Sequence, residues 1–272
     1  MQNFKTISQK HPLSAYFILA YFLTWIIEIP LALQKQGVIR EFFPFGIHYF
    51  AAFGPMLSAI IITSLINGKR GFSELIGRMF KWRVAVVWWL VAILPLILFI
   101  LLSFAFWLIK GTVLNLGILG NIDFLPGLGI LALPLWIITF GFGEETGWRG
   151  FALPRLQKNR TALSATLILG LLWFGWHIPA FFYVYKLAIA PGMLFGVLSG
   201  AIVFTWLYNS SRGSILIVAL WHGVFNYTTA ATEVKSGVIA AILSTVVMVW
   251  AVLIIFIFKP KNLSHINRQI IE

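Results

Sequence analysis

Eight runs of predominantly apolar residues follow one another along the sequence, each about as long as a bilayer-crossing helix, roughly 17–25 residues. Only 10% of the residues are charged and 60% are hydrophobic, whereas about 25% of a soluble domain is charged. A soluble fold could not cover its core with so little polar surface. We therefore predict an all-α, polytopic integral membrane bundle of about eight transmembrane helices. The runs are approximately Ser14–Leu33, Ile47–Ile66, Val84–Ile109, Gly127–Phe151, Ala162–Phe182, Pro191–Tyr208, Ser214–Ala230 and Gly237–Phe258.

The basic residues predict how this bundle is oriented. If the first run leads away from the N-terminal side, that side holds 15 of the 20 Lys and Arg residues and the opposite side holds 5. Short cytoplasmic loops accumulate Lys and Arg, so both termini are expected in the cytoplasm. The net charge of +12 then marks a basic membrane face, and we expect lipid and no nucleic acid as a partner.

No repeat or low-complexity tract divides the chain, which we interpret as a single polytopic membrane domain, residues 1–272. Its cytoplasmic tails would be about 1–13 and 259–272, and its motif-bearing core about 127–230. The first run is about 20 residues long, the length of a membrane span rather than of a cleavable signal. The absence of Cys excludes disulfides, cysteine nucleophiles and thiolate metal sites.

Ionisable residues inside the apolar runs are the candidates for function, because a charge within the bilayer is costly. Glu28 stands alone near the outer end of the first run, and we expect it to reach the membrane interface. Glu144 and Glu145 are adjacent in the fourth run. Arg149 follows Glu145 by four residues, the spacing of a helical ion pair, which leaves Glu144 about 100° around the helix and facing a cavity. The alternative is a solvated cluster in the cytoplasmic headgroup region.

Two further runs contribute His177, and His222 with Asn226 four residues later on the same helical face. Each could instead be a packing residue, because polar side chains commonly join membrane helices. At 1.5 Å per residue, Glu144 and His222 lie about 15–16 Å from their cytoplasmic ends and His177 about 9 Å deeper. One shared polar cavity, reached by tilting the fifth helix or through a partly immersed connection between the fourth and fifth helices, would satisfy these buried groups together.

A carboxylate, two imidazoles and an amide contain the groups that hydrolysis needs. Glu144 could take a proton from water and deliver it to the leaving amine, with His177 holding that water. His222 and Asn226 could donate hydrogen bonds to the developing oxyanion. Alternatively, Glu144, His177 and His222 could bind Zn²⁺, which would activate the water as a Lewis acid. Both possibilities remain open at this point.

Other classes of intramembrane protease fit the sequence less well. There is no His-Glu-x-x-His motif, Asp123 is the only Asp, and Ser199 is one residue out of the Gly-x-Ser-Gly spacing.

Three motifs do occur in order on separate apolar runs: Glu144-Glu145-x-x-x-Arg149, aromatic-x-x-x-His177 and His222-x-x-x-Asn226. This pattern resembles the CPBP family, the CAAX-protease and bacteriocin-processing intramembrane proteases also called Abi, which include the type II CAAX prenyl endopeptidases. Trp173 stands where the second motif usually has Phe.

The resemblance implies a glutamate-dependent peptidase of similar helical architecture in a prokaryotic plasma membrane. It implies that Glu144 activates water with His177 as its partner, and that His222 and Asn226 stabilise the oxyanion. The implied supporting residues are Glu145 and Arg149. Cleavage is expected near the cytoplasmic side, on peptides or membrane-protein segments. The family is often described as metalloproteases although its metal requirement is disputed, so Zn²⁺ stays open, and nothing in the sequence identifies a prenyl pocket.

Two rival functions belong to other classes. A non-proteolytic peptide-binding protein, such as a bacteriocin self-immunity protein, could keep the same motifs for helix packing or peptide capture. A proton-coupled transporter could use buried Glu and His groups, but it would be favoured by inverted repeats, which the sequence does not display.

Overall fold

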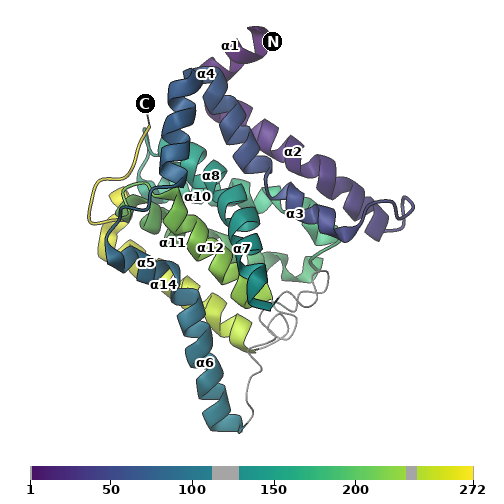
Figure 1. Ribbon diagram of the computed structural model, residues 1–272, viewed down its shortest axis with the longest axis vertical. Helices are drawn as coiled ribbons and strands as arrows, with labels where there is room; N and C mark the ends of the chain where they lie inside the picture. The colour runs from purple at the N-terminus through teal and green to yellow at the C-terminus, as the bar shows by residue number, and fades with distance from the viewer. Residues whose placement is uncertain (1, 112–128, 231–237, 272) are drawn as a thin grey trace.

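A computed structural model describes residues 2–111, 129–230 and 238–271 (Figure 1). Within these ranges the protein is all helical and contains no strand, which confirms the predicted fold class. The first half of the chain forms α1 (Gln2–Lys10), α2 (Pro12–Lys35), η1 (Phe45–Ile47), α3 (His48–Ala51), α4 (Gly54–Met79), α5 (Val86–Ala92) and α6 (Leu94–Lys110). The second half forms η3 (Gly129–Leu131), α7 (Ala132–Trp136), η4 (Ile137–Phe142), α8 (Gly143–Gly147), η5 (Trp148–Ala152), α9 (Leu153–Leu156), α10 (Ala162–Trp176), η6 (Ile178–Phe182), η7 (Leu187–Ile189), α11 (Ala190–Ser210), α12 (Ile215–Ala230) and α14 (Val238–Asn262).

The predicted count of eight spans is not confirmed. Among the described residues, five helical stretches are long and apolar enough to cross a membrane, or six if the bent pair α5 and α6 is one span. This pair bends by 52° at Ile93, and Pro95, the second residue of α6, lacks the N–H that a continuous helix needs. The seventh predicted span corresponds to the shorter apolar helix α12. The first residues of the fourth and eighth predicted spans, Gly127 and Gly237, lie outside the described residues.

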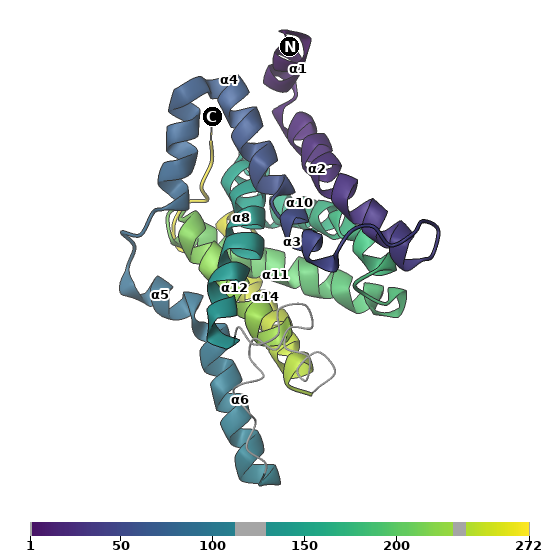
Figure 2. The same ribbon diagram turned by 45° about the vertical axis from the view of Figure 1, so that its right-hand side comes forward.

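The fourth predicted run is one continuous helical segment whose hydrogen-bonding pattern changes along its length. Two π-helical turns, η4 and η5, flank the short α-helix α8. In a π-helical turn each backbone hydrogen bond joins residues five apart, one more than in an α-helix. Such turns often occur at functional sites. Segment η4 packs against α12, and α8 packs against α4, so the run lies inside the bundle (Figures 1 and 2).

Small residues allow the helices around this run to approach closely. A Cβ at Gly143 would lie 2.7 Å from the carbonyl oxygen of Ala52, and one at Gly223 would lie 2.6 Å from the Cα of Ile137. Glycine is therefore required at both contacts, a common solution where membrane helices touch backbone to backbone. The side chains of Trp148, Phe151 and several neighbours are fully buried in the largest core cluster.

Two backbone turns set the ends of predicted spans. Gly68 has φ 59° and ψ −150°, a conformation that favours glycine, and α4 reverses direction there (Figure 1). Lys259, with φ 62°, ends the apolar part of α14 one residue after the predicted boundary at Phe258. Both ends of the described chain lie at the same end of the molecule in the two views (Figures 1 and 2).

The C-terminal segment packs back onto the bundle. The side chains of Gln157 and Asn209 form a reciprocal amide pair, with N···O distances of 2.9 and 3.2 Å. Gln157 Nε2 also donates to the carbonyl of Gln269, and Asn209 Nδ2 donates to the carbonyl of Asn262. This part of the predicted tail is thus fixed to the ends of α9 and α11.

Candidate active site

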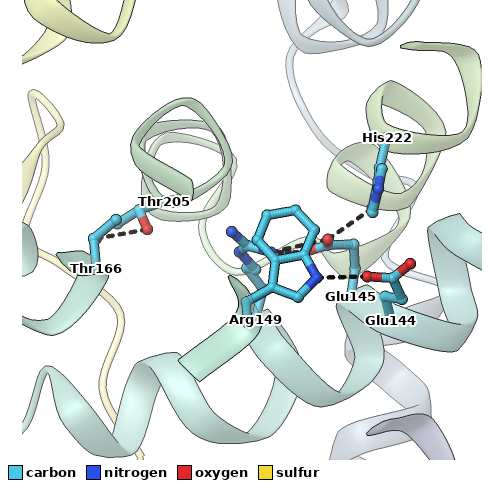
Figure 3. A network of polar contacts seen from close by, with 7 residues as sticks. Glu144, Glu145, Arg149, Thr166, Thr205 and His222 are labelled. Atoms are coloured by element: carbon cyan, nitrogen blue, oxygen red, sulfur yellow. Dashed lines mark hydrogen bonds and ion pairs between the residues drawn. The ribbon is translucent and has the colours of Figure 1, made fainter. Parts of the chain in front are cut away.

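A buried ion pair lies at the centre of the bundle (Figure 3). Arg149 Nη1 donates to both carboxylate oxygens of Glu145 at 2.9 Å, as the four-residue spacing predicted. Both side chains are fully buried, and only 2% of Glu144 is exposed. The alternative of a solvated headgroup cluster is therefore wrong, because these three residues are enclosed by neighbouring helices.

His222 completes this ion-paired network from α12. Its Nδ1 lies 2.9 Å from Glu145 Oε1, and its exposure is 4%. The guanidinium of Arg149 lies 4.7 Å from the ring centroids of both Trp173 and Phe204. Its Nε and Nη2 atoms have no hydrogen-bond partner, so the aromatic faces supply part of the stabilisation that water would otherwise give. The network therefore holds a carboxylate, an arginine and an imidazole without solvent.

Glu144 has a different environment from that of Glu145. Its Oε2 accepts a hydrogen bond of 2.7 Å from the indole Nε1–H of Trp173 on α10. The ring of Trp173 also packs edge-on against His222, with centroids 5.5 Å apart. From the sequence, Trp173 was only an aromatic substitution in the second motif, and its role as a donor to Glu144 was missed. The sequence shows a tryptophan at this position, but no local pattern indicates that its partner is Glu144, 29 residues away.

His177 lies where α10 ends. The α-helix stops at Trp176, and the chain continues as the 3₁₀ helix η6 with Pro179 as its second residue. The predicted depth of His177 assumed one straight helix, so it does not apply beyond Trp176. The Nδ1 atom of His177 donates to the carbonyl of Trp173 at 2.8 Å. Helix α2 holds this junction, because Tyr21 donates to the carbonyl of Leu172 and Trp25 donates to that of Trp176.

The structure brings three of the four candidate catalytic residues to one indole. Trp173 bonds to Glu144, and its ring centroid lies 5.9 Å from that of His177 and 5.5 Å from that of His222. Asn226 lies one turn after His222 on α12 and is half-buried. Within the described ranges, no side-chain hydrogen bond joins Asn226 to the other three candidate residues. A catalytic role for Asn226 is supported only by its position one turn after His222 on the same helix.

The hydrogen-bond partners fix the tautomers of the two histidines. A carbonyl oxygen and a carboxylate can only accept, so Nδ1 of His177 and Nδ1 of His222 each carry a proton. When neutral, both rings therefore present an unprotonated Nε2. His177 can accept a hydrogen bond from water there, whereas His222 can donate from Nε2 only as an imidazolium.

The possible zinc site fits this geometry poorly. In the part of the chain that the structure describes, no three His, Asp or Glu side chains are placed to hold one metal ion. The bonds of Glu144 to Trp173 and of His222 to Glu145 use Oε2 and Nδ1 and would leave Oε1 and Nε2 for a metal, but the side chains are not grouped around one point. The residues Glu144, His177 and His222 thus do not form a ligand set in this arrangement.

A cavity of about 310 Å³ is lined mainly by residues of α4, together with Arg155 of α9 and Ile271. Arg78 and Arg155 line it, and Arg78 donates to the carbonyl of Gly150 at 2.8 Å. Burial, and then the positive charge of Arg78, lower the pKa of Arg155 to about 10. None of the four candidate catalytic residues lines this cavity.

A second polar network surrounds Glu28, which was expected at the membrane interface. That expectation is wrong: only 2% of Glu28 is exposed, because Tyr183 donates to its Oε1 at 3.1 Å and His48 Nδ1 lies 3.6 Å from the same oxygen. His48 Nδ1 and the Tyr183 hydroxyl are 2.6 Å apart. Tyr183 is 155 residues from Glu28 in the sequence, so no local pattern could have predicted this network.

Two comparisons show which known proteins this chain resembles in sequence. Residues 126–228 match the family model described as "Type II CAAX prenyl endopeptidase Rce1-like", and this segment contains all three motifs. The chain is also 27% identical over 242 residues to "CAAX prenyl protease 2" of Methanococcus maripaludis, an alignment that covers 80% of this chain and 84% of that protein. These matches confirm the resemblance that the motifs indicated.

Proposed function

Because this chain is related to the CAAX protease family, we propose that it is an intramembrane endopeptidase that hydrolyses a peptide bond with water activated by Glu144 and His177. The observation that carries this proposal is the division of labour between adjacent carboxylates. Glu145 is paired with Arg149 and His222, whereas Glu144 is bonded to an uncharged indole beside His177. Glu144 is thus the carboxylate available for proton transfer.

Water activation uses Glu144 and His177 together. His177 presents the lone pair of Nε2, because its Nδ1 is bonded to a carbonyl, and this nitrogen accepts a hydrogen bond from the water. Glu144 takes the water's proton as the oxygen attacks the peptide carbonyl, and it later delivers the proton to the leaving amine. Two acceptors therefore orient one nucleophile.

His222 and Asn226 stabilise the oxyanion that forms on the peptide carbonyl. His222 donates from Nε2 as an imidazolium, and Glu145 holds the ring in place through Nδ1 at 2.9 Å. Asn226 supplies a neutral amide donor from the same helical face. Arg149 holds the carboxylate of Glu145 in place through both oxygens, so the ion pair acts through His222 and does not itself touch the substrate.

In this proposal the reaction runs on side chains of the chain; within the described residues, Glu144, His177 and His222 are not grouped as the ligands of one metal ion. We place the substrate opening on the cytoplasmic side, with residues 1–272 as one plasma-membrane domain of a prokaryote and both termini in the cytoplasm. The basic residues support this orientation, because the predicted eight-span arrangement places 15 of 20 on the side of the termini, although Arg149, one of the 15, is buried inside the bundle. The substrates we propose are peptides or membrane-protein segments.

The test compares the membrane proteomes of cells that carry the wild-type protein or its Glu144→Ala variant by mass spectrometry. We expect product peptides that are present only with the wild type, and these would identify the cleavage sequence. The purified protein in liposomes should cleave a peptide of that sequence, and Glu144→Ala and His177→Ala should each reduce its kcat by at least about 10³-fold. Both variants should keep the wild-type melting temperature.

Comparison of the same peptide with and without a C-terminal prenyl group tests whether the lipid group named in the relative's description matters here. Full cleavage by both alanine variants would contradict a catalytic role for these residues. A binding or immunity phenotype that survives in Glu144→Gln, without any product peptide, would favour the non-proteolytic alternative.

A further inference from the structure

Trp173 contacts most of the proposed catalytic machinery. Its indole Nε1–H donates to Glu144, its carbonyl accepts from His177, and its ring lies against His222. The same ring faces the guanidinium of Arg149 at 4.7 Å. A single residue of α10 is thus in contact with side chains from three helical segments.

The hydrogen bond to Glu144 is a specific feature and not a general property of buried indoles in this protein. Four other buried tryptophans in the described ranges have an indole N–H without a hydrogen-bond partner: Trp136, Trp176, Trp206 and Trp221. The N···O distance from Trp173 to Glu144 is 2.7 Å, within the range of bonds to an ionised acceptor. Exposure is 5% for Trp173 and 2% for Glu144, so water does not compete for this contact.

The bond selects one of the two carboxylate oxygens. Because Trp173 holds Oε2, rotation of the Glu144 carboxylate would break a buried hydrogen bond. Oε1 is then the oxygen directed to the water. A phenylalanine at this position would keep an aromatic face for Arg149 and a contact for His222, but it has no N–H group and could not fix the carboxylate.

We propose that Trp173 is a positioning residue of the hydrolytic site, whose indole N–H holds Oε2 of Glu144 so that Oε1 alone receives the proton of the attacking water. This inference rests on the proposed function, since it assigns Trp173 a role in the reaction attributed to Glu144. It gives the aromatic position of the second motif a role beside the four proposed catalytic residues, and it gives the departure from Phe a chemical purpose.

The activity test compares Trp173→Phe with the matched control Trp206→Phe. Trp206 is a buried tryptophan whose indole N–H has no partner, and it packs against Trp88 and Trp250, away from the site. We expect Trp173→Phe to lower kcat by about 10- to 100-fold with an unchanged KM, the range for loss of one hydrogen bond to a charged group. Trp206→Phe should leave kcat and KM unchanged.

A second measurement does not depend on activity. In protein labelled with ¹⁵N at the indole nitrogens, the N–H resonance of Trp173 is the one missing in Trp173→Phe. We expect this proton resonance to move upfield in Glu144→Gln, because an amide oxygen is a weaker acceptor than a carboxylate. The resonance of Trp206 should not move. If Trp173→Phe fails to fold, the tryptophan analogue with sulfur in place of the indole N–H removes only the donor.

The outcomes separate the two proposals. A wild-type kcat in the variant without the donor, combined with an inactive Glu144→Ala, overturns the role of Trp173 and leaves the proposed function intact. Full activity of Glu144→Ala overturns both. A fall in kcat at constant KM, together with the shifted indole resonance, supports the positioning role, because a purely structural defect would lower the melting temperature as well.

Discussion

Two buried glutamates in this bundle are stabilised in different ways. Glu145 accepts from Arg149 and lies against His222, so its negative charge is matched by a buried cation. Glu28 accepts from the hydroxyl of Tyr183, its Oε2 has no partner, and no Lys or Arg among the described residues pairs with it. Two glutamates that are both buried thus have different partners, so burial by itself does not indicate which buried glutamate takes part in catalysis. The network with compensated charge lies beside the proposed chemistry, and the hydrogen-bonded one joins α2 to the segment after His177.

Removal of Arg149 should have the largest effect on this comparison. Arg149→Met leaves Glu145 buried without its cation, which costs about 3–5 kcal/mol of folding free energy. We expect a strongly lowered thermal midpoint in detergent, or no folded protein. The matched control is the double variant Arg149→Met with Glu145→Leu, which removes both charges and should recover most of the lost stability. Equal stabilities of Arg149→Met and the wild type would contradict charge compensation at Glu145.

Loss of the Tyr183 hydroxyl should have an intermediate effect. Tyr183→Phe keeps the ring but removes the donor to Glu28 and the contact with His48, which should cost about 1–3 kcal/mol. Thermal unfolding measures this cost. Tyr185→Phe is the control, because Tyr185 is 36% exposed and, among the described residues, the hydroxyl that donates to Glu28 is that of Tyr183. A cost as large as that of Arg149→Met would mean that the two networks are equivalent.

The exposed ion pair between Arg70 and Glu74 sets the lower limit of the series. These side chains are 91% and 62% exposed and 3.3 Å apart, so water and salt screen their attraction. Glu74→Gln should change the free energy of unfolding by no more than about 0.5 kcal/mol. An effect similar to that of Tyr183→Phe would show that burial does not control the ranking.

The sequence was sufficient to predict contacts between residues that are close together on one helix. The pair of Glu145 and Arg149 follows from a four-residue spacing, and the apolar runs predicted the helical class. Contacts between helices could not be predicted in this way. The donor of Glu144 and the partners of Glu28 come from distant segments, so the assumption that a lone glutamate reaches the interface was wrong. The span count was not confirmed, because Pro95 and the π-helical turns divide runs that the sequence presents as continuous.

The two π-helical turns around α8 make the number of residues in this helix as important as their identity. Deletion of one residue from Ile137–Phe142 would convert that turn to α-helical geometry and rotate α7 by about 100° relative to α8. The side chains before the turn would then face the wrong neighbours, although no residue of the three motifs had changed. An alignment of related chains that places a one-residue gap here would thus signal altered orientation of the catalytic helix, and substitutions of equal length offer the safer way to redesign it.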